Sequence, residues 1–103
     1  MDTSEVTVVR IYCREGEGRL KELMHKLHDD YKVRGVTVFR GTAGYGDSGE
    51  LHTSRLLDIS LDLPQVIEFF DTPDKVSDIL AEMDASLPAG HVLSWTAMVN
   101  SQT

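Results

Sequence analysis

Four short apolar segments alternate along the chain with two longer segments in which apolar residues recur every three or four positions. Residues 5–13, 36–42, 65–70 and 91–99 are rich in β-branched and aromatic side chains, which favours strands. The short run at 57–61 is a weaker candidate for extending this strand pairing, because Asp58, Asp62 and Pro64 interrupt the pattern. The segments predict four main strands.

Residues 17–31 predict an amphipathic helix. Apolar side chains recur there at helical spacing, at Leu20, Leu23, Met24, Leu27 and Tyr31. Charged side chains occupy the other positions, at Arg19, Lys21, Glu22 and Lys26. Gly35 is the expected C-terminal stop, since glycine accepts the left-handed conformation that ends many helices.

A second helix is predicted to start in the sequence DTPDK. Thr72 can cap it, Pro73 fits the first turn because it lacks an N–H that would be unpaired there, and Asp74 suits the positive end of the helix dipole. The expected buried stripe follows at Val76, Ile79, Leu80, Met83 and Leu87. The sequence PAG is expected to end the helix.

The predicted order is strand, helix, strand, strand, helix, strand. This is an α+β fold, the ferredoxin-like βαββαβ sandwich, and residues 1–103 form a single domain. Both faces of the predicted sheet are apolar: Val6 and Val8 oppose Val9 and Ile11 in the first strand, and Leu93 and Trp95 lie on one face of the last. A sheet covered by helices on one side only normally alternates apolar and polar positions. We therefore expect another subunit on the second face.

Composition restricts the classes of partner. The formal net charge of −7 argues against a nucleic-acid-binding surface, which needs clustered lysine and arginine. The apolar runs are far shorter than the roughly 20 residues of a membrane-spanning helix, and the N-terminus lacks the features of a signal peptide. The single cysteine, Cys13, excludes an internal disulfide. We expect a soluble, cytoplasmic protein.

The stretch GTAGYGDSGELHTSRLLD, residues 41–58, is long and polar and has no apolar periodicity before Leu56. Connections of this length in small domains are usually functional or disordered. Glycines at 41, 44 and 46 surround Tyr45. They either form ordinary turns or let backbone N–H groups approach a phosphate or a base closely.

Cationic and polar side chains accompany these glycines: Arg40, His52, Thr53 and Arg55. Arginine can neutralise phosphate oxygens through paired hydrogen bonds, so these residues are candidate ligand contacts. In the alternative interpretation, Arg40 pairs with an acid across the sheet and Arg55 pairs with Asp58.

Other reactive residues have simpler explanations. His25 and His28 lie three residues apart on the first helix, but no third metal ligand is near them in sequence, which favours a solvated helix face. Cys13 fits a small buried hydrophobic residue. His91 begins the last strand and could face a subunit cleft. Trp95 fits core or interface packing.

The sequences RGTAGYG, HTSRLLD, LDLP and DTPDKV occur in this order, and with the surrounding chain they resemble the DUF190 family of PII-like proteins. The resemblance covers nearly the whole chain. It implies a PII-like homotrimer in which a flexible T-loop-like connection joins the second and third strands. It also implies a ligand at the clefts between subunits, contacted by Arg40, Gly41, Gly44, Tyr45, Gly46, His52, Thr53 and Arg55.

By the same resemblance, the protein is a regulator that presents residues 43–55 to a target membrane transporter, channel or enzyme. The chain departs from classical PII proteins in the segments ASLPAGHVL and AMVNSQT, which contain no lysine or arginine. A triphosphate would be poorly neutralised there. We therefore expect AMP, ADP or a cyclic nucleotide as the effector, and no catalytic or metal-binding residues.

Two alternatives remain from the sequence. A small enzyme could use His52, Tyr45, Asp58 or Glu50 as acid or base, although their spacing matches no recognisable catalytic arrangement. A trimeric metal-binding shell of the CutA type would have the same architecture.

Overall fold

The computed structural model describes residues 1–45, 52–53 and 62–101. Strand β1 (Thr3–Arg14) leads through a 3-10 turn (Glu15–Glu17) into α1 (Arg19–His25), which continues as a π-helical turn (Lys26–Asp30). Strand β2 (Gly35–Arg40) follows, then the two-residue strands β3 (Ala43–Gly44) and β4 (His52–Thr53). Strand β5 (Pro64–Asp71), helix α2 (Pro73–Met83), a 3-10 turn (Asp84–Ser86) and strand β6 (Val92–Asn100) complete the order.

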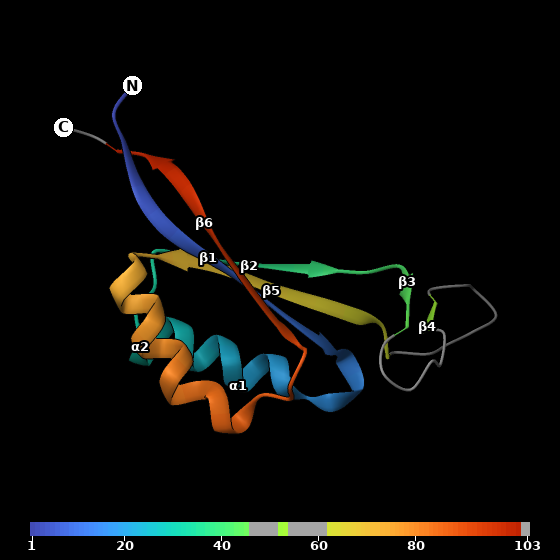
Figure 1. Cartoon of the computed structure of the whole chain (residues 1–103). Coiled ribbons are helices and arrows are strands. Elements are labelled where there is room, and N and C mark those ends of the chain that lie inside the picture. Colours follow the sequence, from blue (N-terminus) through green and yellow to red (C-terminus); the bar gives the residue numbers. More distant parts are fainter. Residues whose placement is uncertain (46–51, 54–61, 102–103) are drawn as a thin grey trace.

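The main sheet has the strand order β2-β5-β1-β6, and its neighbouring strands are antiparallel. Both helices lie on one face of it (Figure 1). This confirms the predicted α+β, ferredoxin-like βαββαβ fold. Strands β3 and β4 form a separate small hairpin beyond one end of the sheet, far from the two chain termini (Figure 1). The sequence did not predict this hairpin, and the weaker candidate strand at 57–61 lies outside the described residues.

The core lies between the helices and the inner face of the sheet. Alternate residues of β1 and β5 supply the sheet side, and one stripe of each helix supplies the other, with Val9, Ile11, Cys13, Leu23, Leu27, Ile67, Phe69, Val76, Ile79 and Met83 all buried. These positions follow the predicted periodicities of two for strands and about 3.6 for helices. The apolar pattern therefore identifies the buried stripe of each helix, whereas the packing of the helices selects which of the two apolar faces of the sheet is the inner one.

Two predicted helix boundaries were wrong. Gly35 does not end the first helix but starts β2, and the chain leaves the π-helical turn through Lys32, whose φ is 52°. The second helix ends at Met83, so Leu87 follows it in extended conformation, although it still packs against the core. The predicted cap is confirmed: the hydroxyl of Thr72 accepts a hydrogen bond from the backbone N–H of Lys75 at 3.4 Å.

The outer face of the sheet, away from the helices, remains open in the single chain. Register places Phe39, Val66 and Tyr12 in one row and Glu68, Arg10 and Leu93 in the next, with Trp95 beside Val8 in the third. Tyr12, Phe39, Leu93 and Trp95 are 39–50% exposed. Arg10 lies 5.6 Å from the ring centroids of both Phe39 and Trp95 and pairs with Glu68 at 2.8 Å.

In the part of the chain that the structure describes, no helix has the length and apolar character needed to span a membrane.

Candidate functional site

A cavity of about 590 Å³ lies at the end of the sheet where β1 and β2 finish and β5 begins. Antiparallel pairing brings these strand ends together, and His91, the residue before β6, lies beside them. The walls of the cavity combine aromatic rings, two arginines and glycine backbone: Tyr12, Cys13, Arg14, Glu17, Phe39, Arg40, Gly41, Ala43, Gly44, Tyr45, Pro64, Val66 and His91. Its size is in the usual range for small-molecule sites.

Four of the predicted site residues line this cavity, namely Arg40, Gly41, Gly44 and Tyr45. The strand that contains His52 and Thr53 pairs with the cavity wall through the β3–β4 hairpin, in the register Gly44↔His52 and Ala43↔Thr53. Gly46 and Arg55 lie outside the described residues. The structure therefore brings part of the predicted set together around one space.

Gly41 and Gly44 are needed for close packing against Pro64. The N–H of Gly41 donates to the carbonyl oxygen of Pro64 at 2.8 Å. A Cβ at position 41 would lie 2.7 Å from Cγ of Pro64, and one at position 44 would lie 3.2 Å from the same atom. The structure thus gives these two glycines a packing role, since the start of the connecting segment passes directly over Pro64 on the cavity wall.

The arginines of the cavity wall are paired with acids. Arg40 contacts Glu15 through Nε, so the pairing anticipated for Arg40 is present, with an acid in the turn after β1. Arg14 lies 3.2 Å from Asp62 and 3.5 Å from Glu17. The side chains of Arg40 and Arg14 are nevertheless 57% and 44% exposed, so both can still donate to a ligand.

Sequence reasoning did not assign Tyr12, Arg14, Phe39 or Val66 to the site, and it could not orient His91. Nδ1 of His91 lies 3.2 Å from the carbonyl oxygen of Tyr12, at the cavity rim. The predicted topology contains a signal for them: in a ferredoxin-like fold the first and second strands finish at the end of the sheet where the third begins. Residues at those three strand ends therefore surround one space.

Cys13 forms part of the cavity wall but is only 5% exposed. Burial raises the pKa of its thiol, so the uncharged form is favoured at neutral pH. This agrees with the prediction of a small buried hydrophobic residue and gives no sign of a reactive thiolate.

His25 and His28 share one acceptor. Nδ1 of each lies 2.6 Å from a different carboxylate oxygen of Asp29, and the hydrogen bond from His28 lowers the pKa of Asp29. Both imidazoles are largely exposed. Among the described residues no group of three histidine, cysteine or acidic side chains is placed to hold a metal ion. The pair fits the predicted solvated helix face.

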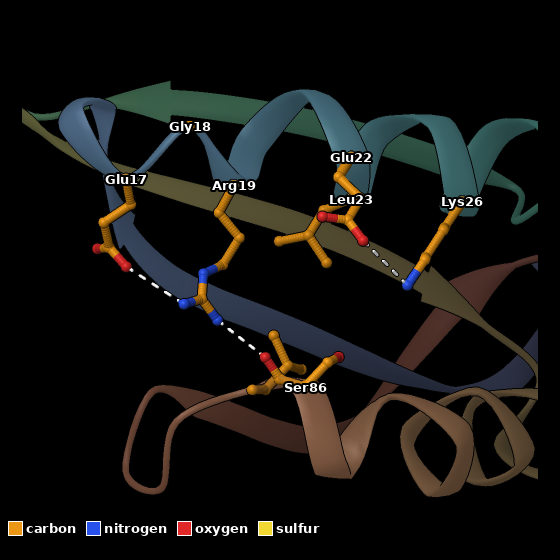
Figure 2. A pocket seen from close by; sticks show the side chains of 8 residues that line it. Glu17, Gly18, Arg19, Glu22, Leu23, Lys26 and Ser86 are labelled. Atoms are coloured by element: carbon orange, nitrogen blue, oxygen red, sulfur yellow. Dashed lines mark hydrogen bonds and ion pairs between the residues drawn. The ribbon is translucent and has the colours of Figure 1, made fainter.

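A second, smaller cavity of about 230 Å³ lies between the start of α1 and the end of α2. In Figure 2 the guanidinium of Arg19 points between Glu17 and Ser86, where it pairs with the acid at 3.5 Å and donates to the Ser86 carbonyl oxygen at 3.0 Å. Lys26 pairs with Glu22 at 3.4 Å on the same wall. The bond from Arg19 to Ser86 connects α1 to the 3-10 turn that follows α2, which indicates a structural role.

Comparisons with known proteins identify the family and the fold of the chain. The profile of the DUF190 family, described as an uncharacterized ACR, matches residues 6–99. A UPF0166 protein of Aquifex aeolicus (strain VF5) is 33% identical over 75 residues, covering 73% of this chain and 76% of the relative.

Among solved structures, CPII from Thiomonas intermedia K12, a nitrogen regulatory PII-like protein bound to ADP, AMP and bicarbonate, superposes with a TM-score of 0.67. It is 18% identical, and the match covers 97% of this chain and 100% of CPII. The divalent ion tolerance protein CutA1 from Ehrlichia chaffeensis has a TM-score of 0.58 at 13% identity, over 95% of this chain and 84% of CutA1. At these identities the likeness establishes a PII-like fold alone.

Proposed function

The chain belongs to the DUF190 family. From this membership and from the cavity at the end of the sheet, we propose that the chain is a PII-like regulatory protein that binds an adenine nucleotide with few phosphates. The observation that carries the proposal is the composition of the cavity wall. Tyr12, Phe39 and Tyr45 offer aromatic surface to a base, and Arg14 and Arg40 offer donors to a phosphate. CPII, which has the same fold, was solved with ADP and AMP.

Assembly into a homotrimer would complete the cavity. Tyr12 and Phe39 belong both to the cavity wall and to the open outer face of the sheet. A contiguous exposed apolar face on a small protein usually marks an interface. A second copy that covers this face would therefore also close the cavity, which makes a site between subunits. The mass of the protein in solution tests the trimer.

The signalling output would pass through residues 43–55, the predicted T-loop-like segment. Its first residues, Ala43 to Tyr45, are part of the cavity wall. A ligand in the cavity would contact the base of this segment. If the ligand binds one arrangement of the segment more tightly than another, it increases the population of the arrangement that it prefers. A target transporter, channel or enzyme could then distinguish the liganded from the free protein.

A thermal-shift series tests nucleotide binding. AMP, ADP, ATP and cyclic AMP are added separately at a fixed protein concentration. A ligand at about a hundred times its dissociation constant adds roughly 2.7 kcal/mol, which raises the Tm of a domain of this size by several degrees. We expect a rise with AMP or ADP.

The variant Arg40→Gln should lose that rise, whereas Lys21→Gln, which removes the same charge from an exposed position on α1, should keep it. The variant Arg55→Ala tests the remaining predicted arginine. No rise with any of the four nucleotides would contradict nucleotide binding and leave the cavity without an assigned ligand.

A further inference from the structure

The two arginines that line the large cavity offer little excess positive charge to an anion. Their partners Glu15, Glu17 and Asp62 contribute three negative charges. Arg19, which also pairs with Glu17, adds a third positive charge to those of Arg14 and Arg40. Within the described residues this ion-pair network therefore carries no net charge, and each acid in it weakens the attraction of the arginines for a phosphate.

The three acids are not held equally. Asp62 also accepts a hydrogen bond from the backbone N–H of Gly16 at 2.8 Å, and Glu17 accepts one from the backbone N–H of Arg14 at 3.0 Å. These bonds fix the turn after β1, so both acids have a structural role. For Glu15 the described residues provide one polar side-chain partner, Arg40. Glu15 is therefore the acid whose charge can be removed with the smallest structural change.

The contact between Glu15 and Arg40 leaves part of the guanidinium available. It uses Nε of Arg40, so the two terminal nitrogens can still donate to a second acceptor. Glu15 itself is not a wall residue, and its side chain is only 16% exposed. Its carboxylate acts behind the arginine, where it reduces the positive charge offered to a ligand without occupying the ligand's space.

We propose that Glu15 sets the charge selectivity of the cavity: its carboxylate, placed behind Arg40, selects against ligands in proportion to their number of phosphates. This inference rests on the proposed function, because it takes the ligand to be an adenine nucleotide. Adenosine would be unaffected by Glu15, AMP would be moderately disfavoured by it, and ATP would be disfavoured most. The residue that pairs with Arg40 would thus select most strongly against the most highly charged of these nucleotides.

Isothermal titration of adenosine, AMP, ADP and ATP against the wild-type protein and Glu15→Gln tests the proposal. One unit charge acting over roughly 8 Å in a partly solvated site changes affinity about fivefold per ligand charge. We expect no change for adenosine, about ten- to twenty-five-fold tighter binding of AMP, whose phosphate carries about 1.5 to 2 negative charges, and progressively larger gains for ADP and ATP. The control Glu22→Gln removes the same charge from an exposed residue outside this cavity and should leave all four affinities unchanged.

Salt dependence provides a second measurement on the wild-type protein. Added salt screens exposed charges, so the preference of the wild type for AMP over ATP should shrink as ionic strength rises. This measurement does not depend on the stability of any variant.

The outcomes separate this inference from the proposed function. If the wild type binds nucleotides but Glu15→Gln tightens adenosine as much as ATP, or leaves the affinities unchanged, the charge-selectivity role of Glu15 is wrong and nucleotide binding stands. If neither protein binds any of the four compounds, the proposed function fails and the inference fails with it.

Discussion

The two ends of β5 carry the same kinds of charged residues in opposite environments. At the last residue of the strand, Asp71 is almost completely buried and accepts hydrogen bonds from the backbone N–H of Thr72 at 2.8 Å and of Arg34 at 3.2 Å. Lys75 pairs with the same carboxylate at 3.1 Å. At the other end, Arg14 of β1 and Arg40 of β2 lie beside the first residues of β5 and pair with acids around an open cavity.

The two ends of β5 differ in how much their charges contribute to stability. The Asp71 carboxylate contacts the end of β5, the start of α2 and the chain entering β2. Its negative charge therefore contributes to the free energy of unfolding. The arginines at the cavity end are about half exposed, and surface ion pairs contribute little to stability. Charges there can be tuned for a ligand without a large effect on the fold.

The largest expected effect comes from Asp71→Ala. Removal of this carboxylate leaves two backbone N–H groups without their acceptor and takes from Lys75 its anionic partner, although Lys75 still donates to the Lys32 carbonyl oxygen. Breaking such a cluster costs about 3 kcal/mol. Urea unfolding measures the loss. The control Asp78→Ala removes an exposed acid of α2 and should change the free energy of unfolding by less than about 0.5 kcal/mol.

The pH dependence of Asp71→Asn identifies the cause of that loss. Burial alone raises the pKa of Asp71, but the hydrogen bonds from Thr72 and Lys75 outweigh it, so the pKa is lowered on folding. A lowered pKa stabilises the folded state above the ordinary aspartate value of about 3.9, and the contribution is lost as pH falls through the folded value. The difference between wild type and Asp71→Asn should therefore be constant from pH 8 to about 5 and shrink below about 4. A constant difference down to pH 2 would contradict an electrostatic role.

An intermediate effect is expected from Gly41→Ala at the cavity end. Its Cβ would overlap Pro64, and overpacking of this kind costs about 1–2 kcal/mol. Gly35→Ala is the matched control, because its Cβ would lie 3.7 Å from the Phe70 ring, an ordinary contact. Thermal unfolding should show a loss for the first variant and little change for the second. Equal Tm values for the two would show that the connecting segment moves away from Pro64 without cost.

The smallest effect on stability is expected from Glu15→Gln. Its ion pair with the exposed Arg40 should contribute about 0.5 kcal/mol or less. Urea unfolding of this variant beside Asp71→Asn compares the same chemical change at the two ends of β5. A loss from Glu15→Gln as large as that from Asp71→Asn would mean that the cavity end is as structural as the other end, and the distinction between them would be wrong.

Much of the fold could be predicted because its determinants are local. The β-branched runs, the helical spacing from Leu20 to Leu27 and the cap at Thr72 each depend on residues within a few positions. The helix boundary at Gly35 was predicted wrongly because the local signal there is ambiguous. Gly35 could end a helix or start a strand, and the left-handed position was taken by Lys32 instead.

Less of the site could be predicted. The residues of the segment starting at Arg40 were found because glycines and a cation cluster there in the sequence. Tyr12 and Val66 were missed because each is an ordinary strand residue when considered alone, and His91 was considered for a subunit cleft but its side chain could not be placed. Only the strand register brings them to the same space.

The order of the main elements, the buried stripe of each helix and the family therefore follow from the sequence alone, because they depend on periodicity and short motifs. The tertiary structure decided which residues share the cavity, that Gly41 packs against Pro64, and which acids partner Arg14 and Arg40. The physical reason is that charge compensation and close packing depend on distances between atoms far apart along the chain. Those distances are set only when antiparallel strands align and their ends meet.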